Sequence, residues 1–224
     1  MTDDDGADTA AQLRSAELRS SLVDRLMRRG TIKTASVERA LRTVPRHLFL
    51  PGVDQQVAYA DEAVALKWSN GRALSSVSQP TMVASMLEML DVHRGARVLE
   101  IGTGSGYNAA LLSELAGDNG AVVSIELDGE LAEIARSQLA SAGYRDVEVH
   151  AADGRAGWPP AAPYDRIVVT ASAPRPEPSW EQQMADGGRM VLPLARELEA
   201  VIFDKVGDAL VRDGSCPALF IPLR

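Results

Sequence analysis

A glycine-rich turn at residues 102–106 carries the strongest chemical signal in the sequence. The apolar run VLEI at 98–101 leads directly into GTGSG, and a helical pattern begins immediately afterwards. Glycines let the backbone turn sharply and approach a ligand closely, while the first turn of a helix offers unpaired N–H donors. The third glycine comes one residue earlier than in the pyrophosphate-binding pattern G-x-G-x-x-G. Glu100, inside the strand end, would repel a pyrophosphate and would suit an ammonium group.

Two further acids follow the next two predicted strands. Glu126 ends the second strand, where a carboxylate can accept both hydroxyls of a ribose, and Asp153 follows the third, where an acid can accept from an adenine amino group. Enzymes that use NAD also place an acid near the position of Glu126, so this residue alone does not choose the cofactor. Each acid by itself is most simply a solvated loop carboxylate, but three at successive strand ends predict S-adenosylmethionine (SAM). The predicted SAM ligands are Glu100, Gly102, Thr103, Gly104, Ser105, Gly106, Glu126, Asp153 and Gly154.

Short β-rich runs alternate with helical segments after Gly95, a pattern typical of βαβ units and a parallel sheet. It predicts a Rossmann-like α/β fold that positions the acids at one sheet edge. The expected strands are 97–101, 121–126, 147–150, 166–170, 190–194, 200–204 and 218–222. The expected helices between them are 107–116, 129–142 and 178–185.

The chain before residue 80 has a different pattern. Residues 1–8 are acidic and offer nothing to bury, so we expect a disordered tail. Apolar positions at helical spacing predict helices over 9–28 and 36–43, and a proline opens another at residue 80. Residues 59–79 show no clear period, which indicates a loop with at most one strand. We therefore predict an N-terminal helical cap with a substrate-side loop over 9–79 and a SAM-binding catalytic domain over 80–224.

The composition argues against several kinds of partner. A net charge of -8 and a pI of about 5.0 disfavour a phosphate-binding surface, so nucleic acid is not expected as a substrate. Since no apolar run reaches the length of a membrane span and the acidic N-terminus is unlike a signal peptide, we predict no membrane partner and a cytoplasmic location. The single cysteine, Cys216, and the scattered histidines have no metal-ligand spacing, so no metal is expected.

Several sequence segments together resemble the protein-L-isoaspartate O-methyltransferase family over nearly the whole chain. They are VPRHLF (44–49), SVSQP (76–80), VLEIGTGSGYNAALL (98–112), YDRIVVTASAP (164–174), GGRMVLPL (187–194) and FIPL (220–223). The resemblance implies a seven-stranded, mostly parallel sheet with a reversed final hairpin. It also implies transfer of a methyl group from SAM to the carboxylate of an L-isoaspartyl or D-aspartyl residue in a protein or peptide, and the ester then closes to a succinimide.

The same resemblance implies roles on the acceptor side. Ser78 matches the family's active-site serine, with Ser76 and Val77 beside it, and Thr170 and Ala171 would line the acceptor pocket. Ser78 could also cap the helix that follows, and strand-end packing explains Ala171 equally well. Because an aspartyl carboxylate, with an ordinary pKa of about 4, is already ionised at neutral pH, no general base is needed. Alignment of the carboxylate and exclusion of water would then supply most of the catalysis.

One segment departs from the family pattern and leaves the acceptor open. Between Tyr59 and Ser78 the family's segment is shorter and contains Gly-Gln-Thr-Ile-Ser, whereas residues 63–78 read AVALKWSNGRALSSVS. This stretch resembles more closely the branch that methylates an aspartate of a ribosomally made peptide to form an aspartimide. We expect isoaspartyl acceptance and keep peptide tailoring as the alternative.

Other reaction classes fit the sequence less well. An amide or base N-methyltransferase would need an Asn/Asp-Pro-Pro-Tyr motif where this chain has TASAP (170–174), and a cytosine C5 enzyme would need a catalytic cysteine, whereas Cys216 lies far from the glycine motif. A module that binds SAM without catalysis stays open. The serine segment beside the cofactor motif argues against it.

Overall fold

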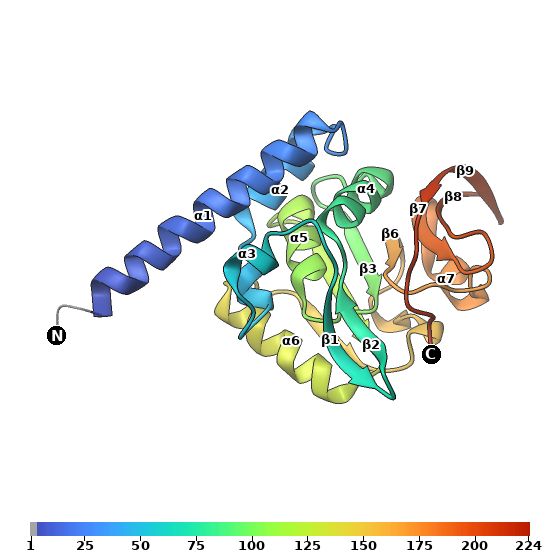
Figure 1. Ribbon diagram of the computed structural model, residues 1–224. Helices are drawn as coiled ribbons and strands as arrows, with labels where there is room; N and C mark the ends of the chain where they lie inside the picture. Colours follow the sequence, from blue (N-terminus) through green and yellow to red (C-terminus); the bar gives the residue numbers. More distant parts are fainter. Residues whose placement is uncertain (1–3) are drawn as a thin grey trace.

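The computed structural model describes residues 4–224 and contains a central seven-stranded sheet, a separate two-stranded hairpin and flanking helices (Figure 1). The sheet order is β5-β4-β3-β6-β7-β8-β9. Its strands are β3 (Arg97–Ile101), β4 (Ala121–Glu126), β5 (Glu148–Ala151), β6 (Tyr164–Val169), β7 (Met184–Leu194), β8 (Glu199–Val206) and β9 (Ala209–Pro217). Strand β8 runs antiparallel to both neighbours, and the other adjacent strands are parallel. The predicted Rossmann-like α/β fold with a reversed final hairpin is confirmed.

The last strand lies at different residues from those predicted. Strand β9 is the polar stretch ALVRDGSCP at the sheet edge, and it pairs with β8 along its whole length. Residues 218–222, predicted as a strand, instead belong to a C-terminal tail (218–224). The tail is fixed beside the end of β6, where Ser172 N donates to Ile221 O (2.9 Å) and Leu223 N donates to Ser172 O (2.8 Å). The prediction was wrong because edge strands tolerate polar side chains, whereas an apolar run also suits a tail that packs on the body.

Helices cover both faces of the sheet. They are α1 (Asp4–Arg28), α2 (Ala35–Thr43), α3 (Gln55–Ala58), α4 (Pro80–Leu90), α5 (Tyr107–Ala116), α6 (Gly129–Ser141) and α7 (Pro178–Gln183), with 3-10 turns η1 (Arg46–Phe49), η2 (Gly154–Ala156) and η3 (Pro159–Ala161). Successive strand residues point to opposite faces, so Val98 joins the core under α4 and α5 while Leu99 and Ile101 join the core that contains Trp180 of α7.

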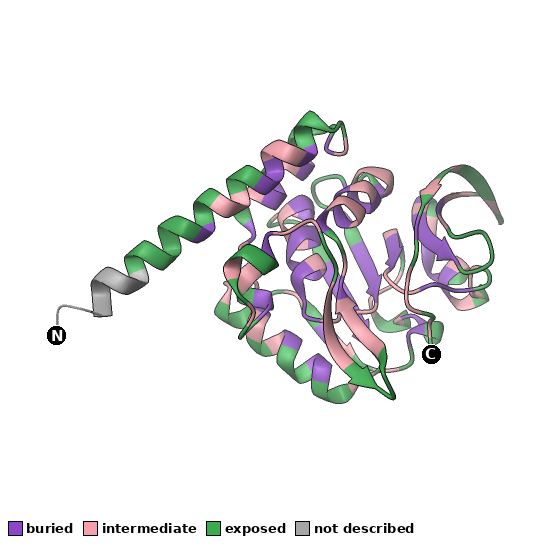
Figure 2. Ribbon diagram, in the orientation of Figure 1, coloured by how far each residue is buried: buried purple, intermediate pink, exposed green. Residues whose placement is uncertain are grey.

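A β-hairpin precedes α4 where the sequence indicated a loop with at most one strand. Strands β1 (Val64–Ser69) and β2 (Arg72–Val77) pair antiparallel and are joined by Asn70-Gly71, both with positive φ (50° and 73°). Two positive φ values favour a tight hairpin turn, and Asn-Gly is its commonest sequence, so the signal was present and the loop prediction was wrong. The hairpin shares no hydrogen-bonded strand with the main sheet. It is half-buried with an exposed tip, whereas the sheet is largely buried (Figure 2).

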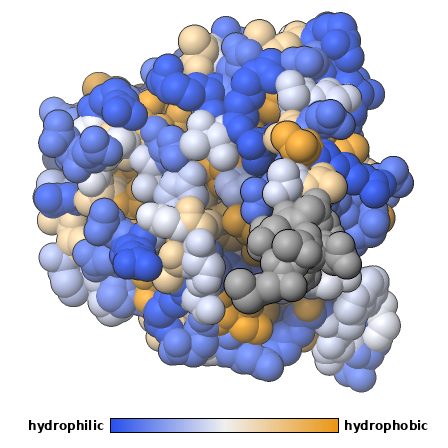
Figure 3. Space-filling view, turned by 90° about the vertical axis from the view of Figure 1, so that its left-hand side faces the viewer, coloured by the Kyte–Doolittle hydropathy of each residue, from blue (hydrophilic) through white to orange (hydrophobic). Residues whose placement is uncertain are grey.

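Helix α1 projects away from the body, and its residues 9–14 are exposed (Figures 1 and 2). Of the predicted disordered tail, residues 1–3 lie outside the described part, but residues 4–8 are helical, contrary to the prediction. The face from which α1 projects is mainly hydrophilic, with apolar side chains in small separate groups (Figure 3). Among residues 4–224 no helix is both long and apolar enough to cross a bilayer.

The apolar core is continuous across the predicted domain boundary at residue 80. Leu26 of α1 and Phe49 of η1 are fully buried in the same apolar cluster as Leu87 of α4 and Leu111 of α5. The division into cap and catalytic domain stays a prediction, although the buried side chains of the two parts pack together.

Candidate active site

A cleft of about 370 Å³ lies at the carboxyl ends of the parallel strands β3, β4 and β6. This is the edge at which open α/β sheets bind their ligands. The hairpin and the start of α4 form one side, and the C-terminal tail forms another. The lining residues predicted from the sequence are Ser76, Ser78, Gly102, Gly104, Glu126, Gly154, Thr170 and Ala171. Val77, Thr103 and Ser105 line a small adjoining hollow of about 40 Å³.

The turn between β3 and α5, residues 102–106 (the glycine turn), is fixed by close contacts that only glycines allow. Gly102 has φ 102°, and a Cβ there would clash with the Thr170 hydroxyl. That hydroxyl lies 2.6 Å from the carbonyl oxygen of Gly102 and 3.0 Å from that of Ile101. Gly106 lines neither hollow, but it begins α5 with φ 88° and packs against Leu139 of α6. The glycines therefore serve both the close approach to the cleft and the packing of α5.

Glu126, at the end of β4, is the carboxylate side chain that the described chain contributes to the cleft. Its Oε2 accepts from Gly104 N (2.9 Å) and its Oε1 from Asp128 N (3.1 Å). These bonds orient the carboxylate across the glycine turn and leave further lone pairs, since an ionised carboxylate accepts about four hydrogen bonds. Its role as a ribose acceptor stays a prediction.

Glu100 lies behind the cleft and lines neither hollow. It is fully buried, where Ser124 Oγ donates to it at 2.5 Å and Asn108 Nδ2 at 2.8 Å. Burial raises the pKa of Glu100 to about 7, against the opposing effect of these two hydrogen bonds. Strand alternation turns Glu100 toward α5, so in this structure it supports the glycine turn. Direct contact with an ammonium group stays a prediction.

Asp153 and Gly154 occupy different positions at the rim. Gly154 is buried in the cleft wall, where a Cβ would lie 2.5 Å from Ile101 Cγ2. The Asp153 side chain is 51% exposed, forms an ion pair with Arg155 (3.2 Å) and accepts from Arg155 N (3.0 Å). Asp153 does not line the cleft, so its predicted contact with adenine is not tested.

Ser78 lies on the acceptor side, between β2 and α4, and lines both hollows. The reading in which Ser78 caps α4 is wrong, because Gln79 is the N-cap and makes no side-chain capping bond. Asp61 instead accepts from Thr81 N (2.9 Å) and Thr81 Oγ1 (2.7 Å). Burial opposes ionisation of Asp61, but these bonds and the Arg29 guanidinium outweigh it and lower its pKa. No described residue accepts a hydrogen bond from the Ser78 hydroxyl.

Arg46, from the VPRHLF segment, fixes the backbone of Ser78 through a hydrogen bond. Its Nη2 donates to Ser78 O and its Nε to Ala58 O, both at 2.9 Å. The guanidinium carbon lies 5.0 Å from the ring centre of Tyr107. Arg46 is fully buried, and burial lowers its pKa. Carbonyl oxygens and an aromatic face thus replace a carboxylate as partners of this charge.

Sequence reasoning missed most of the apolar lining of the cleft and all of its C-terminal tail. The lining residues it did not name are Ala63, Leu74, Ser75, Gln79, Met82, Ile101, Ile125, Leu127 and the tail residues 219–224. Leu127 could have been found, because it directly follows the acid at the end of β4. The tail gave no such signal, because its place beside Ser172 depends on long-range packing.

The comparison with known families decides the class of protein. The protein-L-isoaspartate(D-aspartate) O-methyltransferase family matches residues 17–224. The chain belongs to this family. It is therefore an S-adenosylmethionine-dependent carboxyl O-methyltransferase of isoaspartyl residues, whose methyl ester closes to a succinimide in protein repair.

Individual relatives of the isoaspartate methyltransferase family extend over almost the whole chain. It is 40% identical to protein-L-isoaspartate O-methyltransferase of Ignicoccus hospitalis over 210 residues, covering 92% of this chain and 97% of the relative. It is 45% identical to protein-L-isoaspartate O-methyltransferase 1 of Archaeoglobus fulgidus over 189 residues, 84% of each chain.

Comparison with solved structures finds the same fold. A protein-L-isoaspartate O-methyltransferase aligns with a TM-score of 0.84 and 32% identity over 91% of this chain, which spans 65% of that longer chain. A Plasmodium falciparum structure described as the same enzyme, in complex with S-adenosyl-L-homocysteine, aligns with a TM-score of 0.78 at 19% identity over 91% of this chain and 97% of its own, and shows the fold alone.

Proposed function

We propose that the cleft binds SAM against the glycine turn and Glu126 and receives the isoaspartyl carboxylate of a protein substrate beside Ser78. The observation that carries this proposal is that one cleft is lined by the glycine turn, by Glu126 and by Ser78. Cofactor and acceptor residues that lie far apart in the sequence thus face one space.

The residues in the cleft fit SAM in chemistry and shape. Gly104 has only loose neighbours, the nearest being Leu66 Cδ1 at 3.6 Å from a Cβ placed there, so the backbone is open to a ligand. Ile125, Leu127 and Met82 offer an apolar surface for a base or thioether. Glu126 would accept from the ribose, and Gly154 would lie beside the adenine. When bound, SAM supplies an electrophilic methyl group.

The chain's own residues have a positioning task. An aspartyl carboxylate is ionised at neutral pH and needs no base, so the cleft must orient it and exclude the water that solvates it. The Ser78 hydroxyl, without a partner among the described residues, would donate to this carboxylate. Thr170, held against the glycine turn, and Ala171 would shape the pocket around it. The predicted exclusion of nucleic acid, membrane and metal and the cytoplasmic location remain inferences from the sequence.

Two versions of one peptide test the acceptor, one with L-isoaspartate and one with L-aspartate at the same position. We expect the isoaspartyl peptide to gain one methyl group and then lose methanol as it closes to the succinimide, while the aspartyl peptide stays unchanged over the same time. Mass spectrometry follows both. The relatives favour this result over peptide tailoring, although the long hairpin is the feature that would favour the alternative. Inertness on isoaspartyl peptides, together with methylation of an aspartate in a constrained peptide, would overturn the proposal.

A further inference from the structure

The β1–β2 hairpin covers the glycine turn without belonging to the main sheet. Leu66 of β1 and Ser75 and Ser76 of β2 are the nearest neighbours of the open side of Gly104. Ser75 and Ser76 also line the cleft. The hairpin therefore covers part of the space in which a ligand on the glycine turn would lie.

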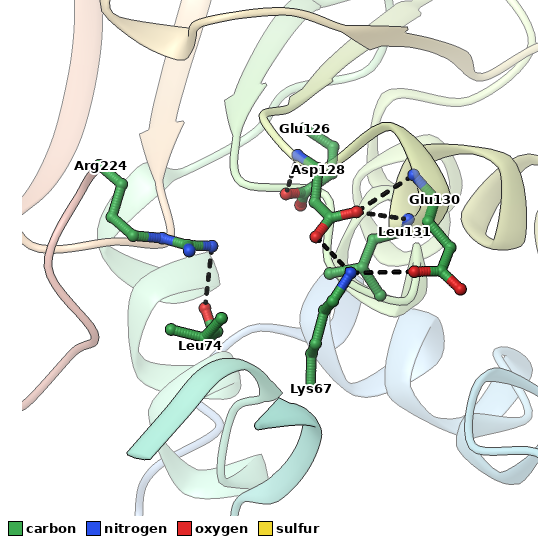
Figure 4. A network of polar contacts seen from close by, with 7 residues as sticks. All are labelled: Lys67, Leu74, Glu126, Asp128, Glu130, Leu131 and Arg224. Carbon is green, nitrogen blue, oxygen red and sulfur yellow. Dashed lines mark hydrogen bonds and ion pairs between the residues drawn. The ribbon is translucent and has the colours of Figure 1, made fainter. Parts of the chain in front are cut away.

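One side chain of the hairpin reaches across to the other wall. Lys67 Nζ, from β1, lies 2.7 Å from Asp128 Oδ2 and 2.9 Å from Glu130 Oε2 (Figure 4). Both carboxylates belong to the start of α6, where Asp128 is the N-cap and accepts from Glu130 N and Leu131 N. The Lys67 ammonium thus links the hairpin to a rigid helix end.

The same helix end is bonded to the cofactor side of the cleft. Asp128 N donates to Glu126 Oε1, and Glu126 Oε2 accepts from Gly104 N. In Figure 4 Glu126 lies directly beside Asp128, and Lys67 approaches from the hairpin. The ion pairs of Lys67 therefore lie next to the predicted ribose acceptor, although Lys67 does not line the cleft.

The tail side of the hairpin is held far more weakly. There Arg224 Nη2 lies 3.5 Å from Leu74 O (Figure 4). A single long bond to a neutral carbonyl contrasts with two charge-assisted contacts at the α6 end. The polar ties of the hairpin are therefore unequal, with the stronger one at the cofactor end.

We propose that the hairpin is a lid over the cofactor and that Lys67 is a positioning residue whose ion pairs with Asp128 and Glu130 set how fast the cofactor and its product exchange. This rests on the proposed cofactor position. The Lys67 side chain is 34% exposed, Asp128 20% and Glu130 74%, and ion pairs exposed to this degree are individually weak, so they would bias the lid without locking it shut. Partly exposed ion pairs are also screened by salt.

The test uses Lys67→Met, which keeps most of the aliphatic stem and removes the charge. Stopped-flow displacement measures dissociation of S-adenosylhomocysteine from the purified enzyme, and hydrogen exchange of residues 64–77 measures lid opening without any ligand. We expect dissociation to rise roughly threefold to tenfold and hairpin exchange to accelerate. In the unsubstituted protein both rates should rise with added salt, and in Lys67→Met this dependence should largely disappear.

Two further variants make the result specific. Glu130→Gln removes one partner of Lys67 and leaves the Asp128 cap intact, so a smaller effect in the same direction is expected. Lys33→Met removes an exposed lysine that does not line the cleft and should change neither rate. Unchanged hydrogen exchange of the hairpin in Lys67→Met would show that the ion pairs of Lys67 do not hold the lid. Faster exchange with an unchanged dissociation rate of S-adenosylhomocysteine would show that the lid does not control the exchange of the cofactor. Neither measurement needs an acceptor, so a failure of isoaspartyl methylation would be seen separately.

Discussion

The glycine turn and the hairpin enclose the same ligand space, but they are built in opposite ways. The turn joins two buried elements, β3 and α5, and its dihedral angles are fixed by contacts with Thr170 and Leu139. The hairpin stands outside the sheet, is only half-buried and is tied at the cofactor end by the two ion pairs of Lys67. Under our proposals the fixed turn would place the cofactor and the loosely attached hairpin would admit it.

The largest effect is expected from adding one methyl group to the rigid side. Gly102→Ala forces a positive φ on alanine and drives a Cβ into the Thr170 hydroxyl, so we expect a loss of about 3 kcal/mol or more in stability and severely weakened SAM binding. Gly71→Ala at the hairpin tip also has positive φ but open space around it, and should cost only about 1 kcal/mol. Chemical denaturation and calorimetry with SAM measure both. Equal losses in the two variants would contradict the contrast between turn and hairpin.

Ser78 lies directly after the hairpin and lines the cleft beside the glycine turn, so removing its hydroxyl tests the place where these two regions meet. Because Ser78 does not cap α4, we expect Ser78→Ala to lower turnover of an isoaspartyl peptide about 100-fold while melting temperature and SAM affinity stay nearly unchanged. Ser85→Ala, on α4, is the control, since its hydroxyl bonds only within the helix (2.9 Å to Thr81 O). Initial rates and thermal melts on the same samples distinguish a role in turnover from a role in stability. A destabilised Ser78→Ala enzyme with normal turnover would restore the capping role.

A smaller effect should appear in the pH dependence of stability. Burial raises the pKa of Glu100 from an ordinary 4.5 to about 7, so the folded state holds this proton more tightly than the unfolded state. Stability contributed by the protonated group is full below the ordinary pKa and is lost as pH rises toward 7.

Glu100→Gln removes this titration while keeping the size of the side chain. Between about pH 5 and about pH 8 its free energy of unfolding should fall less than that of the unsubstituted protein, by up to about 3 kcal/mol. Urea denaturation at both pH values measures the difference. Identical pH dependence in the two proteins would show that Glu100 ionises normally.

The same contrast explains what the sequence could predict. The buried strands and the glycine turn were found because apolar runs, glycines and acids recur there at fixed spacing. Glu100 was identified, but its contact was not, since the sequence alone did not show that its strand face points to Asn108 on α5. The hairpin was missed for want of a clear alternation, despite its Asn-Gly turn. The tail could not be placed because its position depends on backbone bonds to Ser172.

The buried guanidinium of Arg46 limits how this protein can be divided. Arg46 and Ser78, whose carbonyl oxygen it bonds, both come from the segment before residue 80, but the guanidinium also lies over Tyr107 at the start of α5. A chain shortened to begin at Pro80 would lose both this contact and the apolar partners of α4 and α5. The segment before residue 80 is therefore not an independent module. An exchange of this segment between relatives should succeed only where the incoming segment places an arginine at the position of Arg46.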